Sequence, residues 1–130
     1  MACLRTLYLV NQNSHWRSKG PMFYGDHLMY QRIYESAASD ADSLAEKMIG
    51  LYGGSALDLK EQSATIASML ANYTSEDVLV NSTKAETYCR DGLGKAIAQL
   101  EAISPGLDNL LRSLYDNREG SLYLLRQRAA

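Results

Sequence analysis

The chain lacks a disulfide framework, since only two of its 130 residues, Cys3 and Cys89, are cysteines. Their spacing is neither a CxxC motif nor that of a zinc site. We expect both to be reduced thiols on helices of a cytoplasmic protein, and a bridge between the two stays open. A chain of this length can bury a core without disulfides or metals, so we expect one domain over residues 1–130.

The sequence also lacks long apolar runs and an excess of either charge. No run approaches the roughly 20 apolar residues that a membrane-spanning helix needs. Residues 1–10 contain no small-residue cleavage site of the kind that ends a signal peptide. A net charge of −2 gives no overall attraction to nucleic acid or to anionic lipid. We therefore expect no membrane partner.

Helical periodicity is what the sequence does contain, and nothing in it indicates a strand. The first predicted helix ends near Lys19-Gly20-Pro21, where glycine and proline interrupt the chain. The second covers residues 22–51 and ends at Gly53-Gly54. Two apolar stripes give this second helix a broad face for several neighbours. The stripes are Met29, Ile33, Ala37, Leu44 and Met48, and Tyr34, Ala38, Ala41 and Ala45.

A long connection over residues 55–73 follows, with a short helix predicted at 62–70. The third long helix is predicted to open at residues 74–77, with a hydroxyl cap and acids in its first turn. Ser104 and Pro105 supply the cap and the first-turn proline of the fourth. Four long helices with a long middle connection indicate an all-α, ferritin-like four-helix bundle. The predicted core faces of the last two helices are Ala85, Cys89, Ala96, Leu100 and Ile103, and Leu107, Leu111, Leu114, Leu122 and Leu125.

Four side chains are candidates for a shared metal site: His15, His27, Asp42 and Glu46. Each histidine alone is more often structural, and an i, i+4 acid pair is most often a solvated helix face. His27 and Asp42 lie fifteen residues apart on one predicted helix, roughly 22 Å along its axis. A site that contains all four must therefore form between two chains, with antiparallel second helices related by a two-fold axis. Two imidazoles and two carboxylates suit ferrous iron or zinc.

Two segments carry specific patterns at matched spacing, and a third segment adds a general similarity. Residues 15–23 read His-Trp-x-x-x-Gly-x-x-Phe, with His27 following, and residues 42–47 read Asp-x-x-Ala-Glu-Lys. Residues 107–126 form a third segment, rich in leucine. Together they resemble the Dps family of mini-ferritins, whose patterns are HW-x-x-x-G-x-x-F and D-x-x-A-E-R/K and whose last helix is similar to the third segment. The resemblance covers nearly the whole chain.

The resemblance implies a ferroxidase centre made of His15 and His27 from one subunit and Asp42 and Glu46 from its partner. This is also the arrangement that the spacing requires. It further implies a homo-oligomer of twelve subunits, iron as the metal with zinc as a substitute, and hydrogen peroxide (or oxygen) as the oxidant. The ferric product would be stored as mineral inside the cage, which protects against oxidative damage.

Single positions bear on that expectation. Trp16 matches a radical trap of the family, and a buried core indole is an equally good explanation. Asp108 lies where the family places acids of an iron-entry pore, and stabilisation of the helix dipole explains it equally well. Gln31 stands where many members have an acid, so the second iron position is expected to be weak or water-bridged. Asp26, just before His27, could be a partner that supports the metal site, and a surface acid is the more common explanation.

Two other functions stay open. A DNA-compacting or scaffold cage could carry a vestigial metal site. DNA binding is doubtful, because the first helix begins almost at Met1 without a Lys-rich extension, and Arg126-Gln127-Arg128 is too short for a phosphate clamp. A shell of twelve copies could still gain avidity, so this function stays open. The same four ligands could instead hold zinc in a structural role. A true ferritin or rubrerythrin is excluded because it needs Glu-x-x-His motifs, and no Glu here has a His three residues later.

Overall fold

The computed structural model describes residues 1–100 and 103–130, and this part of the chain contains five α-helices and no strand. The helices are α1 (Ala2–Arg17), α2 (Phe23–Tyr52), α3 (Leu59–Leu70), α4 (Val78–Gln99) and α5 (Pro105–Ala129), with a short 3-10 turn at Gly54–Ala56. The all-α prediction is confirmed. Every helix of the described residues is too short or too polar to cross a bilayer.

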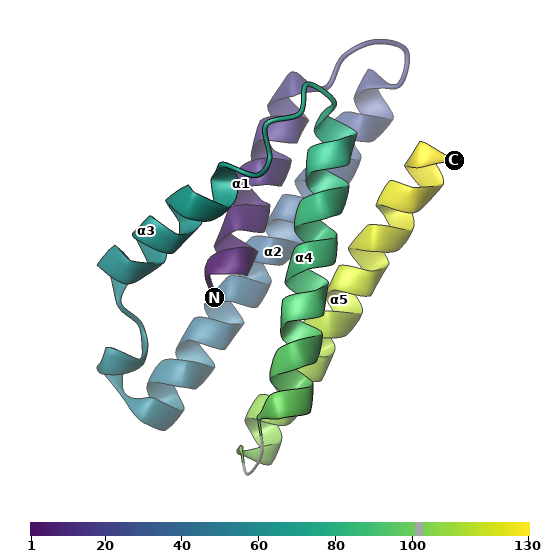
Figure 1. The fold of residues 1–130 in the computed structure, drawn as a ribbon. Helices are drawn as coiled ribbons and strands as arrows, with labels where there is room; N and C mark the ends of the chain where they lie inside the picture. The colour runs from purple at the N-terminus through teal and green to yellow at the C-terminus, as the bar shows by residue number, and fades with distance from the viewer. Residues whose placement is uncertain (101–102) are drawn as a thin grey trace.

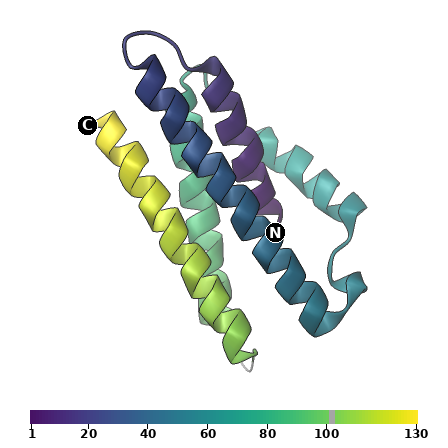
Figure 2. The ribbon, with the colours of Figure 1, turned by 180° about the vertical axis from the view of Figure 1, so that it is seen from behind.

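The four long helices lie side by side, and α3 lies on the outside of α1 (Figures 1 and 2). Helices α1 and α5 run in one direction and α2 and α4 in the other (Figure 1). The connection from α2 to α4 must therefore return along the length of the bundle, and α3 forms part of it. One long crossover between the second and third long helices characterises the ferritin-like four-helix bundle, as predicted.

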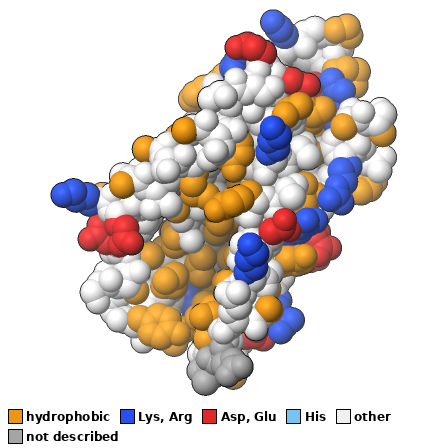
Figure 3. Space-filling model, viewed as in Figure 1, with side chains coloured by type: hydrophobic (Ala, Val, Ile, Leu, Met, Phe, Trp, Pro, Cys, Tyr) orange, Lys and Arg blue, Asp and Glu red, His pale blue; other side chains and the backbone are white. Residues whose placement is uncertain are grey.

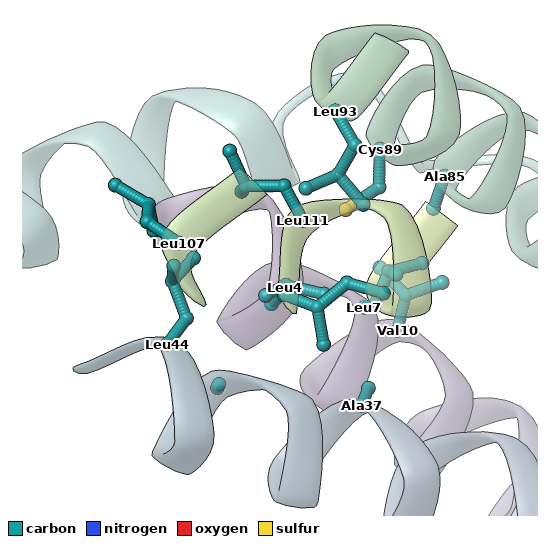
Figure 4. Close-up of a cluster of buried hydrophobic side chains, with 12 residues drawn as sticks. Leu4, Leu7, Val10, Ala37, Leu44, Ala85, Cys89, Leu93, Leu107 and Leu111 are labelled. Atoms are coloured by element: carbon teal, nitrogen blue, oxygen red, sulfur yellow. The ribbon is translucent and has the colours of Figure 1, made fainter. Parts of the chain in front are cut away.

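The core is built by apolar side chains that repeat every three or four residues on the inward face of each long helix. Leu4 and Leu7 of α1 are completely buried, as are Leu122 and Leu125 of α5. Figure 4 shows side chains from all four long helices meeting in the largest cluster. Burying one leucine stabilises a fold by about 1.5–3 kcal/mol relative to leaving it exposed. Apolar burial is therefore the main force that holds the helices together.

Side-chain caps set the first residue of the last three helices. Asp58 accepts a backbone N–H from the first turn of α3, so this helix begins earlier than predicted. Asp77 caps α4 in the same way, so the hydroxyl cap predicted within residues 74–77 is wrong. The first turn of α4 also contains no acid, contrary to the prediction. Ser104 caps α5, with Pro105 in its first turn, as predicted.

Two predicted apolar stripes are only partly correct. Leu100 follows the last residue of α4 and is 47% exposed, and Leu93 of α4 packs into the core instead. The predicted stripe also includes Ile103, although α4 ends at Gln99. Residues 101 and 102, which the prediction placed in this helix, lie outside the described residues. On α2, Ala38 of the second stripe is exposed. The other members of that stripe are buried or partly buried.

Candidate metal centre

The two histidines come together where α1 connects to α2. Because α1 ends at Arg17 and α2 begins at Phe23, His15 lies in the last turn of one helix and His27 near the start of the next. The connection is short because Gly20 has a φ of 86°, a left-handed conformation that glycine adopts without strain. The N–H of Phe23 donates to the carbonyl of Gly20 at 3.0 Å and closes the turn. The glycine of the first motif thus allows the chain reversal that places the imidazoles side by side.

The two imidazole rings stack with their centroids 3.5 Å apart and their planes inclined by 22°. His15 Nδ1 lies 2.8 Å from the His27 carbonyl oxygen, and His27 Nδ1 lies 3.0 Å from the His15 carbonyl oxygen. Because a carbonyl oxygen can only accept, each Nδ1 carries a proton and donates it. In the neutral ring each Nε2 then keeps its lone pair. Such a bond fixes the tautomer and the ring orientation that a metal-binding histidine needs.

Aromatic side chains surround the histidine pair. Tyr34 packs edge-on against His15 with a centroid distance of 5.4 Å, and Phe23 packs against His27 at 5.1 Å. His15 is only 9% exposed, so its ring is held within the fold. Trp16, by contrast, is 67% exposed, and the explanation of this residue as a buried core indole is wrong. A role for Trp16 as a radical trap stays a prediction.

The two candidate carboxylates lie farther along α2 and are both exposed. Asp42 lines a groove of about 490 Å³ between α1, α2 and α3, and Glu46 borders a separate depression. Nowhere in residues 1–100 and 103–130 do three His, Cys, Asp or Glu side chains come close enough to hold a metal ion. One chain therefore brings the histidines together and leaves the carboxylates apart from them, as the helix spacing predicts. A site shared between chains stays a prediction.

The interior of the bundle, where other ferritin-like proteins bind metal between facing helices, contains a different polar cluster. Arg118 of α5 is fully buried and donates to Glu86 of α4 at 2.9 Å and to Asp40 of α2 at 3.2 Å. The same guanidinium donates to Ser36, and Asn117 donates to Asp40. A cation of the protein itself thus lies between the two buried carboxylates.

Sequence reasoning missed this buried cluster, although a signal for it exists. Arg118 lies in the leucine stripe of α5, four residues after Leu114 and four before Leu122. Asp40 and Glu86 are buried on the inward faces of α2 and α4 in the same way. Charged residues at core positions of three helices, with both signs present, indicate a buried ion cluster rather than a break in each stripe.

One guanidinium cannot neutralise two buried carboxylates. The pKa of Glu86 is raised to about 7, chiefly because burial disfavours its charged form, and Arg118 only partly opposes this effect. Burial also raises the pKa of Asp40. At mildly acid pH the folded protein therefore keeps a proton on this cluster that the unfolded chain has already released.

We expect the free energy of unfolding to fall as the pH rises from about 4.5 to about 7. Because the folded pKa of Glu86 lies above its ordinary value, its stabilising contribution is complete below 4.5 and is lost as the pH passes 7. The change is about 3 kcal/mol, since each pKa unit corresponds to about 1.4 kcal/mol. Urea unfolding at a series of pH values measures it, and Glu86→Gln, which cannot titrate, should give a flatter profile. An equal slope in both proteins would contradict this role of Glu86.

Asp26 ties the start of α2 to the end of α5. Its carboxylate accepts two hydrogen bonds from Arg128, at 2.6 and 3.0 Å, and its side chain is only 14% exposed. The expectation of a surface acid at this position is therefore wrong. The acid holds a C-terminal arginine in place instead.

Gln31 and Asp108 are also engaged with neighbours on their own helices. The Gln31 amide donates to Glu35 at 2.9 Å. Asp108, in the first turn of α5, accepts a hydrogen bond from Arg112 at 3.0 Å. The roles predicted for these two residues concern iron and therefore stay predictions.

Comparison with known proteins finds relatives along part of the chain. The chain is similar to General stress protein 20U of Bacillus subtilis (strain 168), with 29% identity over 75 residues. These residues are 56% of this chain and 52% of that protein. It is also similar to the DNA protection during starvation protein of Brevibacillus brevis, with 30% identity over 80 residues, 62% of this chain and 49% of that protein. DNA protection during starvation protein 2 of Bacillus anthracis is 31% identical over 55 residues, which are 42% of this chain and 38% of that protein. No protein-family model matches. The chain spans about half the length of the curated relatives it matches.

Proposed function

We propose that the chain is a member of the Dps family, and that it oxidises ferrous iron at sites shared between two subunits and stores the ferric product; its similarity to two DNA protection during starvation proteins supports the family assignment. The observation that carries this proposal is the histidine pair, whose reciprocal Nδ1 hydrogen bonds leave two Nε2 atoms free for a metal. Two of the relatives are named for DNA protection. Removal of ferrous iron and peroxide is a chemical route to such protection.

The complete site needs a second copy of the chain. A two-fold axis that sets the α2 helices antiparallel brings Asp42 and Glu46 of one subunit to the histidines of the other, twice in each dimer. Ala38 lies on α2 between the two half-sites, and its small exposed side chain leaves room for a partner helix. We propose that this dimer is the unit of a homo-oligomeric cage, for which the family resemblance implies twelve subunits.

The donor set suits ferrous iron as the substrate. Two imidazole nitrogens and two carboxylates hold the ion with positions left open for the oxidant. With hydrogen peroxide, two ferrous ions give up one electron each, the O–O bond breaks, and two protons are taken up as two waters form. Transfer of both electrons avoids release of a hydroxyl radical. The carboxylates favour the ferric product, because a harder and more highly charged ion prefers oxygen ligands.

Three further residues would modify this reaction. Gln31 is uncharged and its amide already bonds to Glu35, so a second iron would bind weakly or through water. Asp108 would line an iron-entry pore, and its ion pair with Arg112 reduces its attraction for cations. The exposed indole of Trp16 would supply an electron to any radical that forms beside His15.

The proposal is tested by loading the protein with ferrous ion without oxygen, adding peroxide and following ferric absorbance. We expect fast oxidation with the iron staying in solution. The double variant His27→Ala, Asp42→Ala removes one ligand of each kind from every site and should be at least about tenfold slower. Asp116→Ala, which removes an exposed acid of α5, is the matched control and should behave as wild type. Equal slow rates in all three proteins, or bound zinc without turnover, would contradict a ferroxidase.

A DNA-compacting cage is the second candidate, favoured by the names of two relatives. On the face shown in Figure 3, Lys and Arg side chains are scattered among acids rather than gathered into one basic patch. Arg128, near the C-terminus, is held by Asp26. Direct compaction would shift duplex DNA on a gel, with a strong dependence on salt. A protein that protects through iron chemistry alone is expected to give no shift at physiological salt.

A further inference from the structure

The only two cysteines of the chain, 86 positions apart in the sequence, meet in the structure. Cys3 lies in the first turn of α1 and Cys89 near the middle of α4, where it packs inside the core cluster (Figure 4). Both are free thiols, and their sulfur atoms lie 2.7 Å apart. This separation is little more than the about 2.05 Å of an S–S bond. A bond between the two needs only a small movement of either side chain.

The two thiols differ in exposure and acidity. Cys3 is half-buried, whereas Cys89 is 1% exposed. The hydrogen bond that Cys89 donates lowers the pKa of Cys3 to about 7, outweighing the opposite effect of burial. The same hydrogen bond and burial raise the pKa of Cys89. Because the thiolate is the nucleophile, Cys3 is the thiol that reacts first, and Cys89 stays protonated beside it.

We propose that Cys3 and Cys89 form a peroxide-reactive dithiol that closes reversibly into a disulfide between α1 and α4. The reaction uses no iron and no residue of the histidine or carboxylate half-sites, so it goes beyond the proposed ferroxidase. It gives the protein a second means of consuming peroxide when no ferrous ion is bound.

The steps balance with hydrogen peroxide as the oxidant. The Cys3 thiolate attacks one peroxide oxygen, the O–O bond breaks, and the other oxygen takes up a proton and leaves as water. Cys3 is then a sulfenic acid. The Cys89 sulfur attacks the Cys3 sulfur, the S–S bond forms, the S–O bond breaks, and hydroxide leaves with the Cys89 proton as a second water. Two electrons pass from the thiols to peroxide, and a thiol reductant reverses the change.

The test uses the iron-free protein with one equivalent of hydrogen peroxide per chain, followed by denaturation and thiol counting with a maleimide. We expect the two free thiols of each chain to be lost together and dithiothreitol to restore them. Tryptic digestion should give residues 1–5 linked to residues 85–90. The oxidised protein should melt several degrees higher, because the bond closes a long loop of the unfolded chain. Thiols that persist in excess peroxide while the helical circular dichroism is unchanged would overturn the proposal, as would links only between chains.

Single variants assign the two roles. In Cys89→Ser, peroxide should leave Cys3 as a sulfenic acid that dimedone traps, because no second thiol can displace the oxygen. In Cys3→Ser, the buried Cys89 should stay unreacted, and oxidation of Cys89 at the wild-type rate would overturn the order proposed. Both variants should keep the wild-type rate of iron oxidation. Failure of the dithiol reaction is thus distinguishable from failure of the ferroxidase.

Discussion

Replacement of Arg118 by alanine is expected to destabilise the folded protein by about 3–5 kcal/mol. The side chain is fully buried, and its guanidinium is the group that bonds to both Glu86 and Asp40. Its removal leaves two carboxylates inside the bundle without a cation, and a buried charge without a partner is costly. A loss of this size is a large fraction of the stability of a typical domain.

Urea unfolding at neutral pH measures this effect, with Arg112→Ala as the matched control on the same helix. Arg112 also pairs with an acid, but its side chain is 63% exposed, so its loss should cost less than about 1 kcal/mol. A triple variant with Arg118→Leu, Asp40→Asn and Glu86→Gln should recover much of the free energy of unfolding that Arg118→Ala loses. No charge is then left buried alone. Equal losses in the two arginine variants would show that the cluster does not depend on its cation.

The helices of the bundle could be predicted because periodicity and capping are local properties. The leucine stripe of α5 and its Ser104 cap are correct for that reason. The cap of α4 was harder to assign, since several side chains before the helix suit a cap and only the fold selects Asp77. The stripe that contains Ala38 shows another limit. A sequence does not distinguish an apolar position that its own chain covers from one that its own chain leaves exposed.

The candidate site could be predicted only in part. The motifs and the helix spacing predict that His15 and His27 form one half-site, and the structure places the two rings in contact. The reciprocal bonds from Nδ1 to the opposite carbonyl depend on how α1 and α2 meet, and residue spacing does not contain that information. The contact between Cys3 and Cys89 was equally hidden, because it joins two helices far apart in the sequence.

The largest functional effect is expected when two inactive variants are combined. One variant carries His15→Ala and His27→Ala, and the other carries Asp42→Ala and Glu46→Ala. If each site takes its histidines from one subunit and its carboxylates from another, neither variant alone can form a complete site. In a mixed dimer, however, the histidines of the second variant meet the carboxylates of the first. One of the two sites is then complete, and the other has lost all four ligands.

The decisive measurement is peroxide-driven iron oxidation after the two variants are unfolded and refolded together in equal amounts. Random pairing makes about a quarter of all sites complete, so we expect about a quarter of the wild-type rate. Each variant refolded alone should show only the slow background. Native mass spectrometry establishes that mixed oligomers have formed. Mixed oligomers that are as inactive as both parents would contradict a ferroxidase site shared between subunits.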